Sequence, residues 1–303
     1  MTDPRRGYAL CGIERGLPLD LGQQAKIDSA LRRLANGMAE QCLSDFAFSN
    51  LYLFRRAHDY RYLPGSHACI SGRTYDGERH LLPLFELHTT PLPILRALLR
   101  GSDCFYPLTR SQVGRLDADL FVASEARDDA DYLYPAAQFR HYRGTALAKK
   151  RNLMKQLLSV HAVESQPYSP AHQGDALAVL RDWMLDKGKS AGEADEAACT
   201  EALQHAPAFG LEGFVYGVEG RPAGFVLAQE IQPAVFVVRF AKGLDAFKGL
   251  YQYMFHHFCS HIGRPLEWLN FEQDLGQVNF RRTKLSYQPS ALLGKFRVRL
   301  RAG

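Results

Sequence analysis

The sequence has no cysteine framework and no long apolar run. No two of its cysteines form a CxxC pair, and their spacing is irregular: they are Cys11, Cys42, Cys69, Cys104, Cys199 and Cys259. This spacing excludes a disulfide scaffold and a cysteine zinc site, so we expect reduced thiols in a cytoplasmic protein. No uncharged stretch approaches the roughly 18 apolar residues that span a bilayer. Residues 1–6 lead into no apolar run of the kind that a signal peptide has.

The common catalytic and nucleotide-binding motifs are missing as well. There is no Gly-x-Ser-x-Gly nucleophile elbow, no Walker loop and no dinucleotide-binding fingerprint. One segment places His257 and His261 at an HxxxH spacing next to His256, but neither a third ligand nor an HExxH motif accompanies them. We therefore predict no metal site.

The composition is that of a globular protein with a mild excess of positive charge. The chain has 303 residues, of which 46% are hydrophobic and 23% are charged, so it can bury one large core or two ordinary ones. The net charge of +5 and the pI of about 8.8 are compatible with an anionic ligand, such as a coenzyme phosphate, a tRNA or a lipid headgroup. They are equally compatible with a solvated surface that binds none of these.

Apolar periodicity and turn residues divide the chain into two mixed units. The first contains a helix at 20–37, a strand or buried turn at 50–54, a hairpin at 67–86, a helix at 91–100 and a strand at 105–108. The second contains helices at 146–161, 175–187 and 193–206, a meander of strands at 214–218, 224–228 and 235–240, a helix at 250–262 and a strand at 266–271. We therefore predict an N-terminal domain over 1–145 and a C-terminal domain over 146–303, the second carrying the active site.

A dense group of carboxylates and amides ends the last predicted strand. Asn270, Glu272 and Asp274 lie there, where a polar group costs free energy to bury unless it finds a partner and where α/β proteins commonly place ligand contacts. Glu272 and Asp274 share one face of an extended chain, so either could act as general base or hold an acceptor amine. The alternative is that they cap the next helix or pair with Arg281 and Arg282.

The segment after this group supplies further candidates. Lys284 and Tyr287 could line the same cleft, and a tyrosine hydroxyl can reprotonate a leaving thiolate or alkoxide. Tyr287 could instead be a packed aromatic residue beside Pro289. Asn270 could likewise satisfy a buried backbone group rather than orient a substrate.

A basic helix could bind the phosphates of a donor. Lys149, Lys150, Arg151 and Lys155 surround Asn152 in the predicted helix at 146–161. These like charges repel one another, and a bound anion would relieve the repulsion. A solvated basic face is the alternative.

The loop at 245–250 is a second candidate for donor binding. It precedes a helix whose N-terminal N–H groups and dipole suit a pyrophosphate. Within it, Gly249 allows close approach of the backbone, and Lys248 offers a positive charge.

The order of helices, meander, loop, helix and strand is similar to the core of a GNAT acyltransferase. Three motifs also resemble a named family, DUF2156 or the phosphatidylglycerol lysyltransferase C-terminal domain. They are Phe48-Ser49-Asn50-Leu51-Tyr52-Leu53-Phe54-Arg55, Lys149-Lys150-Arg151-Asn152, and Asn270-Phe271-Glu272-Gln273-Asp274-Leu275-Gly276 with Lys284-Leu285-Ser286-Tyr287-Gln288-Pro289. The resemblance covers roughly residues 20 to 300.

This resemblance implies an α/β (α+β) protein with two tandem GNAT-like acyltransferase folds and mixed, mostly antiparallel sheets, similar to the Fem-type peptidyltransferases. In the lysyltransferases the domain moves an aminoacyl group from a charged tRNA to a lipid headgroup, and it follows a multi-span membrane region that this sequence does not show. The resemblance therefore implies a transferase whose acceptor differs from membrane lipid or is met at the membrane surface.

We predict an acyl- or aminoacyltransferase that uses coenzyme A or aminoacyl-tRNA as donor and an amine or hydroxyl as acceptor, on a small molecule or a lipid headgroup. The predicted catalytic residues are Glu272, Asp274 and Tyr287, the substrate-binding residues are Asn270, Arg282 and Lys284, and the donor-binding residues are Lys150, Arg151, Asn152, Lys248 and Gly249. The alternative is a non-catalytic GNAT-like protein that binds a ligand or partner. Ala246 and Tyr251 favour it, because GNAT loops usually have a polar and a small residue there.

Overall fold

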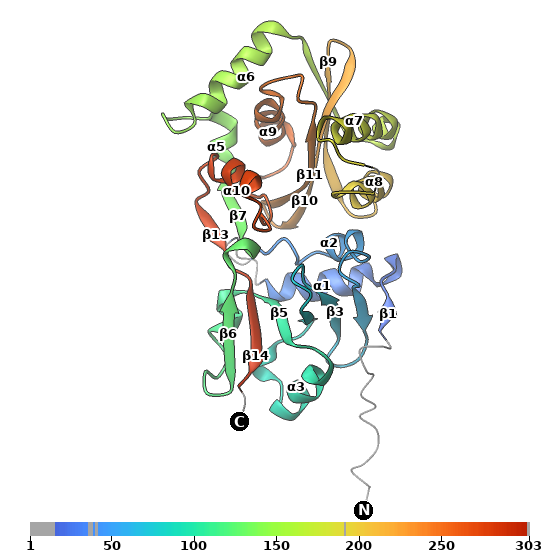
Figure 1. Cartoon of the computed structure of the whole chain (residues 1–303), viewed down its shortest axis with the longest axis vertical. Coiled ribbons are helices and arrows are strands. Elements are labelled where there is room, and N and C mark those ends of the chain that lie inside the picture. The colour runs from blue at the N-terminus through green and yellow to red at the C-terminus, as the bar shows by residue number, and fades with distance from the viewer. Residues whose placement is uncertain (1–15, 36–38, 40–41, 191, 302–303) are drawn as a thin grey trace, which may run out of the picture.

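The computed structural model describes residues 16–35, 39, 42–190 and 192–301. Cys11 and the last residues of the predicted helix at 20–37 lie outside the described residues. The described chain forms two seven-stranded sheets, each covered by helices, one above the other along the long axis of the molecule (Figure 1). We call them the first lobe, built on the sheet that begins with β1, and the second lobe, built on the sheet that ends with β8.

The sheet of the first lobe has the order β1-β2-β3-β4-β5-β14-β6. Its strands are β1 (Leu17–Pro18), β2 (Arg61–Leu63), β3 (Cys69–Arg73), β4 (Arg79–Pro83), β5 (Cys104–Leu108), β14 (Phe296–Leu300) and β6 (Phe121–Glu125). Its helices are α1 (Gln24–Leu34), α2 (Phe48–Leu53), α3 (Leu92–Leu98) and α4 (Arg110–Val113). The β4–β5 pair is parallel and the other pairs are antiparallel. The predicted hairpin at 67–86 is confirmed, with Ile70 opposite Leu82.

Residues 48–53 form the short helix α2 rather than a strand. The buried side chains in this segment include Phe48 and Leu51, which lie three residues apart and therefore point to the same side of a helix. Both join the core cluster that also contains Leu31 of α1 and Phe209, which follows the helix α8 (Glu196–Gln204). Burial of this face, rather than strand propensity, decides the local structure.

The sheet of the second lobe has the order β13-β7-β12-β11-β10-β9-β8. Its strands are β13 (Ala291–Leu293), β7 (Asp131–Pro135), β12 (Trp268–Asn270), β11 (Val235–Gly243), β10 (Arg221–Gln232), β9 (Leu211–Val218) and β8 (Val163–Pro167). The meander of β9, β10 and β11 is confirmed as antiparallel. The strand predicted at 266–271 is β12, which pairs in parallel with β11.

Helices cover both faces of this second sheet. On one side lie α7 (Gln173–Asp186) and α8 (Glu196–Gln204). On the other lie α5 (Ala136–His141), α6 (Ala148–Val160), α9 (Leu250–His261) and α10 (Val278–Leu285) (Figure 1). A large aromatic cluster, with Phe139, Phe255, Phe258 and Tyr287, fills the space between the sheet and α9.

The chain passes between the two sheets twice, once more than a simple division into two domains requires. It leaves the first sheet after β6 to form β7 in the second, and after β13 it returns to the first sheet as β14. A single apolar cluster also contains Ile70 and Leu82 of the first sheet together with Phe225 and Leu227 of the second. The domain boundary at residues 145 and 146 stays a prediction, and the two sheets exchange strands across it.

Candidate functional site

The polar group at 270–274 lies where β12 ends, at the junction of the two lobes. Asn270, which is fully buried, donates from Nδ2 to the Cys42 carbonyl oxygen at 3.1 Å and to Asp131 Oδ2 at 2.9 Å. Its Oδ1 accepts a hydrogen bond from the Glu272 N–H at 2.7 Å. Every polar atom of the Asn270 side chain is therefore engaged with protein, and the amide fixes the turn that follows β12.

Glu272 is held in a specific orientation by a buried arginine. Its backbone has a φ of 58°, in the left-handed region that non-glycine residues rarely adopt. Its Oε1 lies 2.8 Å from Nη1 of Arg239 on β11; the Glu272 side chain is 22% exposed, whereas the Arg239 side chain is fully buried. Burial raises the pKa of Glu272, and the charge of Arg239 opposes that rise without cancelling it. Glu272 therefore combines access to solvent with an elevated proton affinity.

Asp274 is surrounded by donors. Arg281 binds it through two nitrogens, at 2.9 Å each, Tyr132 donates its hydroxyl at 2.5 Å, and the Gly276 N–H donates at 2.9 Å. Burial alone would raise its pKa, but the hydrogen bonds from Arg281 and Tyr132 hold the pKa well below its usual range. Because the carboxylate is fully buried and both oxygens are engaged, the geometry favours the ion pair with Arg281 over a role as general base.

Lys284 closes the loop between β12 and α10. Its ammonium donates to three consecutive carbonyl oxygens, those of Phe271 at 2.6 Å, Glu272 at 3.2 Å and Gln273 at 2.5 Å. Burial lowers the pKa of Lys284 to about 8, which leaves the amine mostly protonated at neutral pH. The ammonium donates only to backbone carbonyl oxygens in these contacts, so Lys284 fixes the turn that contains Glu272. Arg282 is exposed on the outer side of α10.

Tyr287 lies in the aromatic cluster, and Lys150 lies over it. The Tyr287 hydroxyl accepts a hydrogen bond from Gln252 Nε2 at 2.8 Å, and burial raises its pKa. Lys150 Nζ lies 3.9 Å from the centre of the ring, a distance at which a cation and an aromatic face attract. The ring itself contacts Phe139 and Phe255. Packing thus places Lys150, which was predicted to bind the donor substrate, against Tyr287, which was predicted to be catalytic.

The other predicted donor residues do not converge. Arg151 Nη1 donates to the Tyr142 carbonyl oxygen at 2.5 Å, and Asn152 and Lys248 are exposed. Gly249 precedes α9 with a φ of 98°, and a Cβ there would lie 2.2 Å from the carbonyl oxygen of Leu153 on α6. The close approach that Gly249 permits is therefore the contact between α6 and α9.

A charged cluster that the sequence reasoning missed lies behind Glu272. Lys295 is 1% exposed, and its Nζ lies 2.5 Å from Asp45 Oδ2 and 2.9 Å from Asp131 Oδ1. It also donates to Gln273 Oε1 at 2.7 Å. We call Asp45, Asp131, Arg239, Glu272 and Lys295 the junction cluster. The available signal was the placement of Arg239 inside the apolar run at 235–240, because a charge within a buried strand requires a partner.

A cavity of about 860 Å³ is connected to the junction cluster through Gln229, although no member of the cluster lines it. It is lined by α1, by residues 207–210 and by the end of β10, and Gln229 forms part of its wall. Gln229 Oε1 accepts hydrogen bonds from Ser49 and from Arg239 Nη2, the latter at 3.3 Å. Asp28 also lines the cavity; burial raises its pKa, although the Phe48 N–H donates to it at 2.7 Å. One amide therefore links the wall of the cavity to the arginine that holds Glu272.

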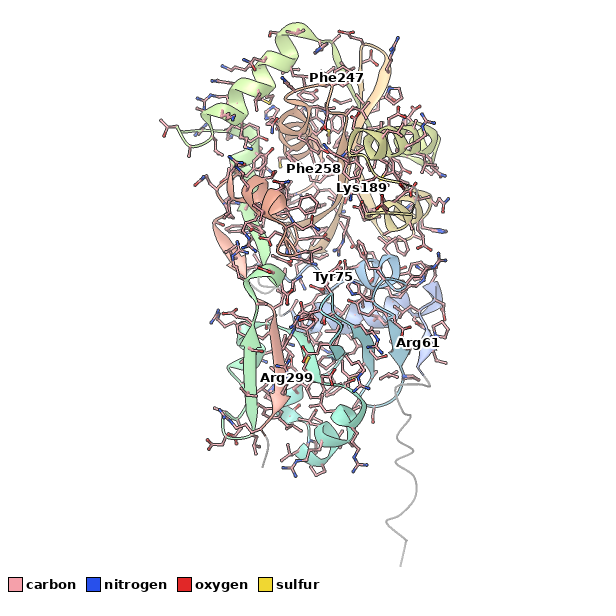
Figure 2. All side chains as sticks on the ribbon, viewed as in Figure 1. Arg61, Tyr75, Lys189, Phe247, Phe258 and Arg299 are labelled. Carbon is pink, nitrogen blue, oxygen red and sulfur yellow. The ribbon has the colours of Figure 1, made fainter. Side chains whose placement is uncertain are left out.

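Tyr75 lies at the boundary between the two lobes (Figure 2). Partial burial, followed by the negative charges of Glu272 and Asp45, raises the pKa of Tyr75, although the residue as a whole is 61% exposed. The ring packs edge-on against His58, with 4.6 Å between ring centres. Tyr75 is therefore a neutral hydroxyl beside the acidic side of the junction cluster.

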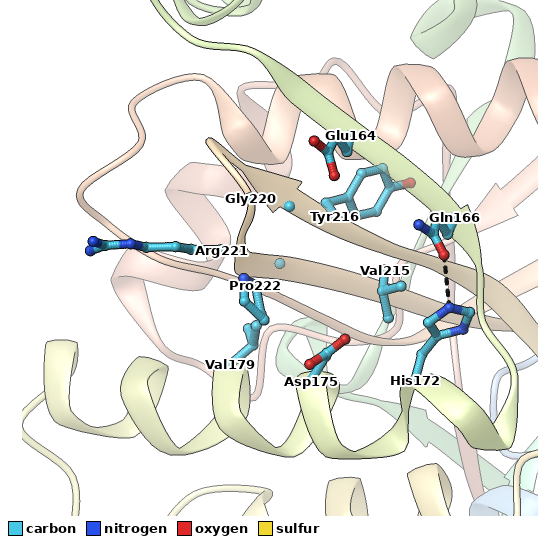
Figure 3. A pocket seen from close by; sticks show the side chains of 12 residues that line it. Glu164, Gln166, His172, Asp175, Val179, Val215, Tyr216, Gly220, Arg221 and Pro222 are labelled. Carbon is cyan, nitrogen blue, oxygen red and sulfur yellow. Dashed lines mark hydrogen bonds between the residues drawn. The ribbon is translucent and has the colours of Figure 1, made fainter.

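A second cavity, of about 110 Å³, lies at the opposite end of β10 (Figure 3). Glu164, Asp175 and His172 line it, and His172 Nε2 lies 2.9 Å from Gln166 Oε1. Figure 3 shows the Arg221 side chain pointing away from the other labelled side chains. Among the described residues, no group of three His, Cys, Asp or Glu side chains is arranged to hold a metal ion.

The fold and the position of these residues define a protein with two tandem GNAT-like folds. Three solved structures share it: a conserved protein from Bacteroides thetaiotaomicron (21% identity, TM-score 0.78, 95% of this chain and 99% of that chain), the L-PGS of Bacillus licheniformis (15%, 0.59, 94% and 93%), and a tandem GNAT protein from the clavulanic acid biosynthesis pathway (9%, 0.50, 95% and 98%).

The family follows from the sequence. The family model described as "Phosphatidylglycerol lysyltransferase, C-terminal" matches residues 38–299, and the chain therefore belongs to this family. None of the curated proteins matches the chain. No helix in the described part of the chain has the length and apolar character needed to cross a membrane.

The structure predicts that Gly249 is needed for packing. Gly249→Ala should lower the free energy of unfolding by roughly 3 kcal/mol or more, because its Cβ would overlap the backbone of α6 in addition to the cost of the positive φ. Gly263→Ala is the matched control: its φ is 72°, but nothing lies within 4 Å of the added Cβ, so about 1 kcal/mol is expected. Urea unfolding of both variants measures the difference. Equal losses would show that the contact with Leu153 is unimportant.

Asp274 should stabilise the fold in a pH-dependent way. Since its pKa is lowered by folding, its contribution is present above the ordinary aspartate pKa of about 3.9 and is lost as the pH falls below that value. Asp274→Asn should therefore destabilise the protein at pH 7 by roughly 1–3 kcal/mol, because Tyr132 and the Gly276 N–H lose a charged acceptor for their hydrogen bonds. The difference in unfolding free energy between the two proteins should shrink below pH 4. A difference that stays constant down to pH 3 would contradict this assignment.

Proposed function

We propose that the protein is an acyl- or aminoacyltransferase in which Glu272 is the general base. One observation carries this proposal: Glu272 is a partly exposed carboxylate with a raised pKa, held by a fully buried arginine at the end of β12. Membership of the lysyltransferase family supports a transferase. Asp274, the other predicted carboxylate, is enclosed by donors and positions α10 instead.

The proposed reaction needs few groups from the protein. The nitrogen or oxygen of the acceptor attacks the acyl carbonyl carbon, and the bond to the donor's sulfur or ribose oxygen breaks. Glu272 takes the proton that the acceptor loses and returns it to the leaving atom. Arg239 keeps the Glu272 carboxylate in place through the 2.8 Å contact, and Lys284 fixes the backbone on which Glu272 stands. Correct placement of the two reactants supplies the remaining rate acceleration.

The cavity of about 860 Å³ is the proposed substrate site. It is large enough for a small ligand, and Gln229 connects its wall to Arg239. The charges of Asp28 and Arg32 in its lining suit a substrate that carries both an amine and an anionic group. An amino acid esterified to a nucleotide has both.

We propose an aminoacyl-tRNA donor in preference to coenzyme A. In GNAT folds, coenzyme A places its pyrophosphate at the N-terminus of the helix that corresponds to α9. Here Gly249 at that N-terminus is packed against α6, and Asp245 of the same loop pairs with Lys187 at 2.6 Å. A carboxylate beside the loop disfavours a pyrophosphate. The family name supports an aminoacyl donor, a lipid or other hydroxyl acceptor, and a cytoplasmic reaction in which tRNA is accessible.

Glu272→Gln should abolish transfer without unfolding the protein. Loss of the base should reduce kcat/KM by about 10²–10⁴-fold, while the neutral amide can still accept the hydrogen bond from Arg239. Glu267→Gln is the matched control, because Glu267 is exposed five residues earlier in the same segment. The assay combines labelled aminoacyl-tRNAs or acyl-coenzyme A thioesters with amine, hydroxyl and phosphatidylglycerol acceptors. Full activity of Glu272→Gln, or no transfer by the native protein with any of these pairs, would overturn the proposal.

The rate should depend on pH in the direction that Glu272 dictates. A base acts when it is deprotonated, so kcat/KM should rise with pH and level off. The midpoint should lie above the ordinary glutamate pKa of about 4.3, since burial raises the pKa of Glu272. A pH–rate profile checks this. A midpoint below 4, or the same acid limb in Glu272→Gln, would assign the titration to another group.

A further inference from the structure

The sequence motif at 48–55 has no part in the reaction described so far, although several of its polar side chains contact the second lobe. Ser49 donates its hydroxyl to Gln229 Oε1, and Arg55 binds the two carboxylate oxygens of Glu201 at 2.7 and 2.8 Å. Helix α2, which contains most of the motif, lies on the side of the first lobe that faces the second (Figure 1). The motif therefore brings side chains of the first lobe to the site of the second.

Asn50 of this motif binds the same arginine nitrogen as the proposed base. Arg239 Nη1 donates to Asn50 Oδ1 at 3.4 Å and to Glu272 Oε1 at 2.8 Å. Because a guanidinium group has donors and no acceptor, the Asn50 amide presents its oxygen to Arg239. The other half of the amide, Nδ2 with its two hydrogens, therefore points away from the arginine.

A donor and an acceptor beside Arg239 remain available to a ligand. Within the part of the chain that the structure describes, neither Asn50 Nδ2 nor Glu272 Oε2 has a hydrogen-bond partner, and both residues are partly exposed. The oxygen atoms next to them, Oδ1 and Oε1, share one nitrogen, so the free donor and the free acceptor belong to neighbouring groups. Acyl transfer needs such a pair: a base for the acceptor's proton and a donor for the carbonyl oxygen, which becomes negatively charged.

Helix α2 holds Asn50 in a fixed position. Phe48 and Leu51, on either side of it in the sequence, are buried, and the Phe48 N–H donates to Asp28 Oδ1 at 2.7 Å. The contact of Ser49 with Gln229 places the same turn next to the wall of the cavity of about 860 Å³. A donor that is fixed before the reaction begins stabilises the charge without a cost of reorganisation.

We propose that Asn50 is the oxyanion-stabilising donor of the transfer reaction; this inference rests on the proposed function. As the acceptor's nitrogen or oxygen bonds to the acyl carbon, an electron pair of the carbonyl double bond moves to its oxygen, and Asn50 Nδ2 donates a hydrogen bond to that oxygen. When the pair returns, the bond to the donor's sulfur or ribose oxygen breaks. Glu272 gives that leaving atom the proton taken from the acceptor, and Asn50 neither gains nor loses a proton.

The other role open to Asn50 is to orient Arg239 and, through it, Glu272. The two roles have different kinetic consequences. Loss of an oxyanion donor slows the reaction and leaves the titration of the base unchanged. Loss of an orienting contact changes the pKa of Glu272, because the charge of Arg239 opposes the rise that burial causes.

Kinetics of Asn50→Ala and Asn50→Leu test the proposal, with the same labelled aminoacyl-tRNA and acyl-coenzyme A donors as for Glu272→Gln. Both variants lack the Nδ2 donor, and leucine keeps nearly the volume of asparagine. We expect kcat/KM to fall by about 10²–10³-fold, the usual effect of removing one oxyanion donor, with the midpoint of the pH–rate profile unchanged. Asn279→Ala, at an exposed position of α10, is the matched control and should keep native activity. Native activity of Asn50→Ala, or a loss that accompanies a shifted midpoint, would overturn the proposal.

A binding measurement gives a second test that needs no turnover. The probes are an aminoacyl-adenosine analogue with a tetrahedral phosphonate in place of the acyl carbonyl, and the planar aminoacyl-adenosine amide. Asn50→Ala should weaken binding of the phosphonate much more than binding of the amide, because the donor acts on the tetrahedral state. Equal weakening of both probes would contradict the proposal.

Glu272→Gln separates this inference from the proposed function. If Glu272→Gln is inactive while Asn50→Ala is fully active, Glu272 remains the base and the inference about Asn50 is wrong. If Glu272→Gln is fully active while Asn50→Ala is slow with an unchanged midpoint, the base is wrong and the oxyanion donor is supported. A native protein that transfers no group from any of these donors overturns both.

Discussion

The ion pair between Lys295 and Asp131 links the two segments in which the chain passes from one lobe to the other. Asp131 begins β7, just after the chain has left the first sheet, and Lys295 stands between β13 of the second sheet and β14 of the first. Both side chains are essentially unexposed, with 2.9 Å between Nζ and Oδ1. A buried charge is strongly unfavourable without a partner, so each crossover requires the other. Burial alone would lower the pKa of Lys295, but the negative charges of Asp131 and Asp45 outweigh it and raise the pKa above its usual value, so the ammonium stays charged.

The same pair organises the candidate site. Asp131 accepts hydrogen bonds from Ser44 and Asn270, and Asn270 in turn accepts from the Glu272 N–H. Lys295 also reaches Gln273, the residue between the two predicted catalytic carboxylates. From the other side, Lys284 binds the carbonyls of this loop. The loop at 271–273 is thus held by polar contacts from both lobes, which allows Glu272 to keep an unusual backbone conformation.

The local patterns of the sequence were enough to predict the meander of β9, β10 and β11 and the helices α7 and α9, because their apolar periodicity reflects burial within one sheet and its cover. The strands β7 and β14 escaped prediction. Each is stabilised by partners distant in sequence, such as Phe296 opposite Glu125 and Leu133 opposite Asn270, and pairing over that distance leaves no local signal. Residues 50–54, predicted as a strand or a buried turn, lie mostly in the helix α2, because tertiary burial of Phe48 and Leu51 favours a helix there.

The position of the polar group after β12 was predictable, but the roles within it were not. The sequence indicated that Asn270, Glu272 and Asp274 need partners. Only the fold shows that Arg281 pairs with Asp274 and that the buried Arg239 pairs with Glu272. The central claim is that the reacting group binds beside this Arg239–Glu272 pair. A crystal structure with a non-hydrolysable aminoacyl-adenosine amide tests it most directly. The account predicts the ligand in the cavity beside Gln229, with its amide next to Glu272; a ligand at the N-terminus of α9 or between Glu164 and Asp175 would contradict it.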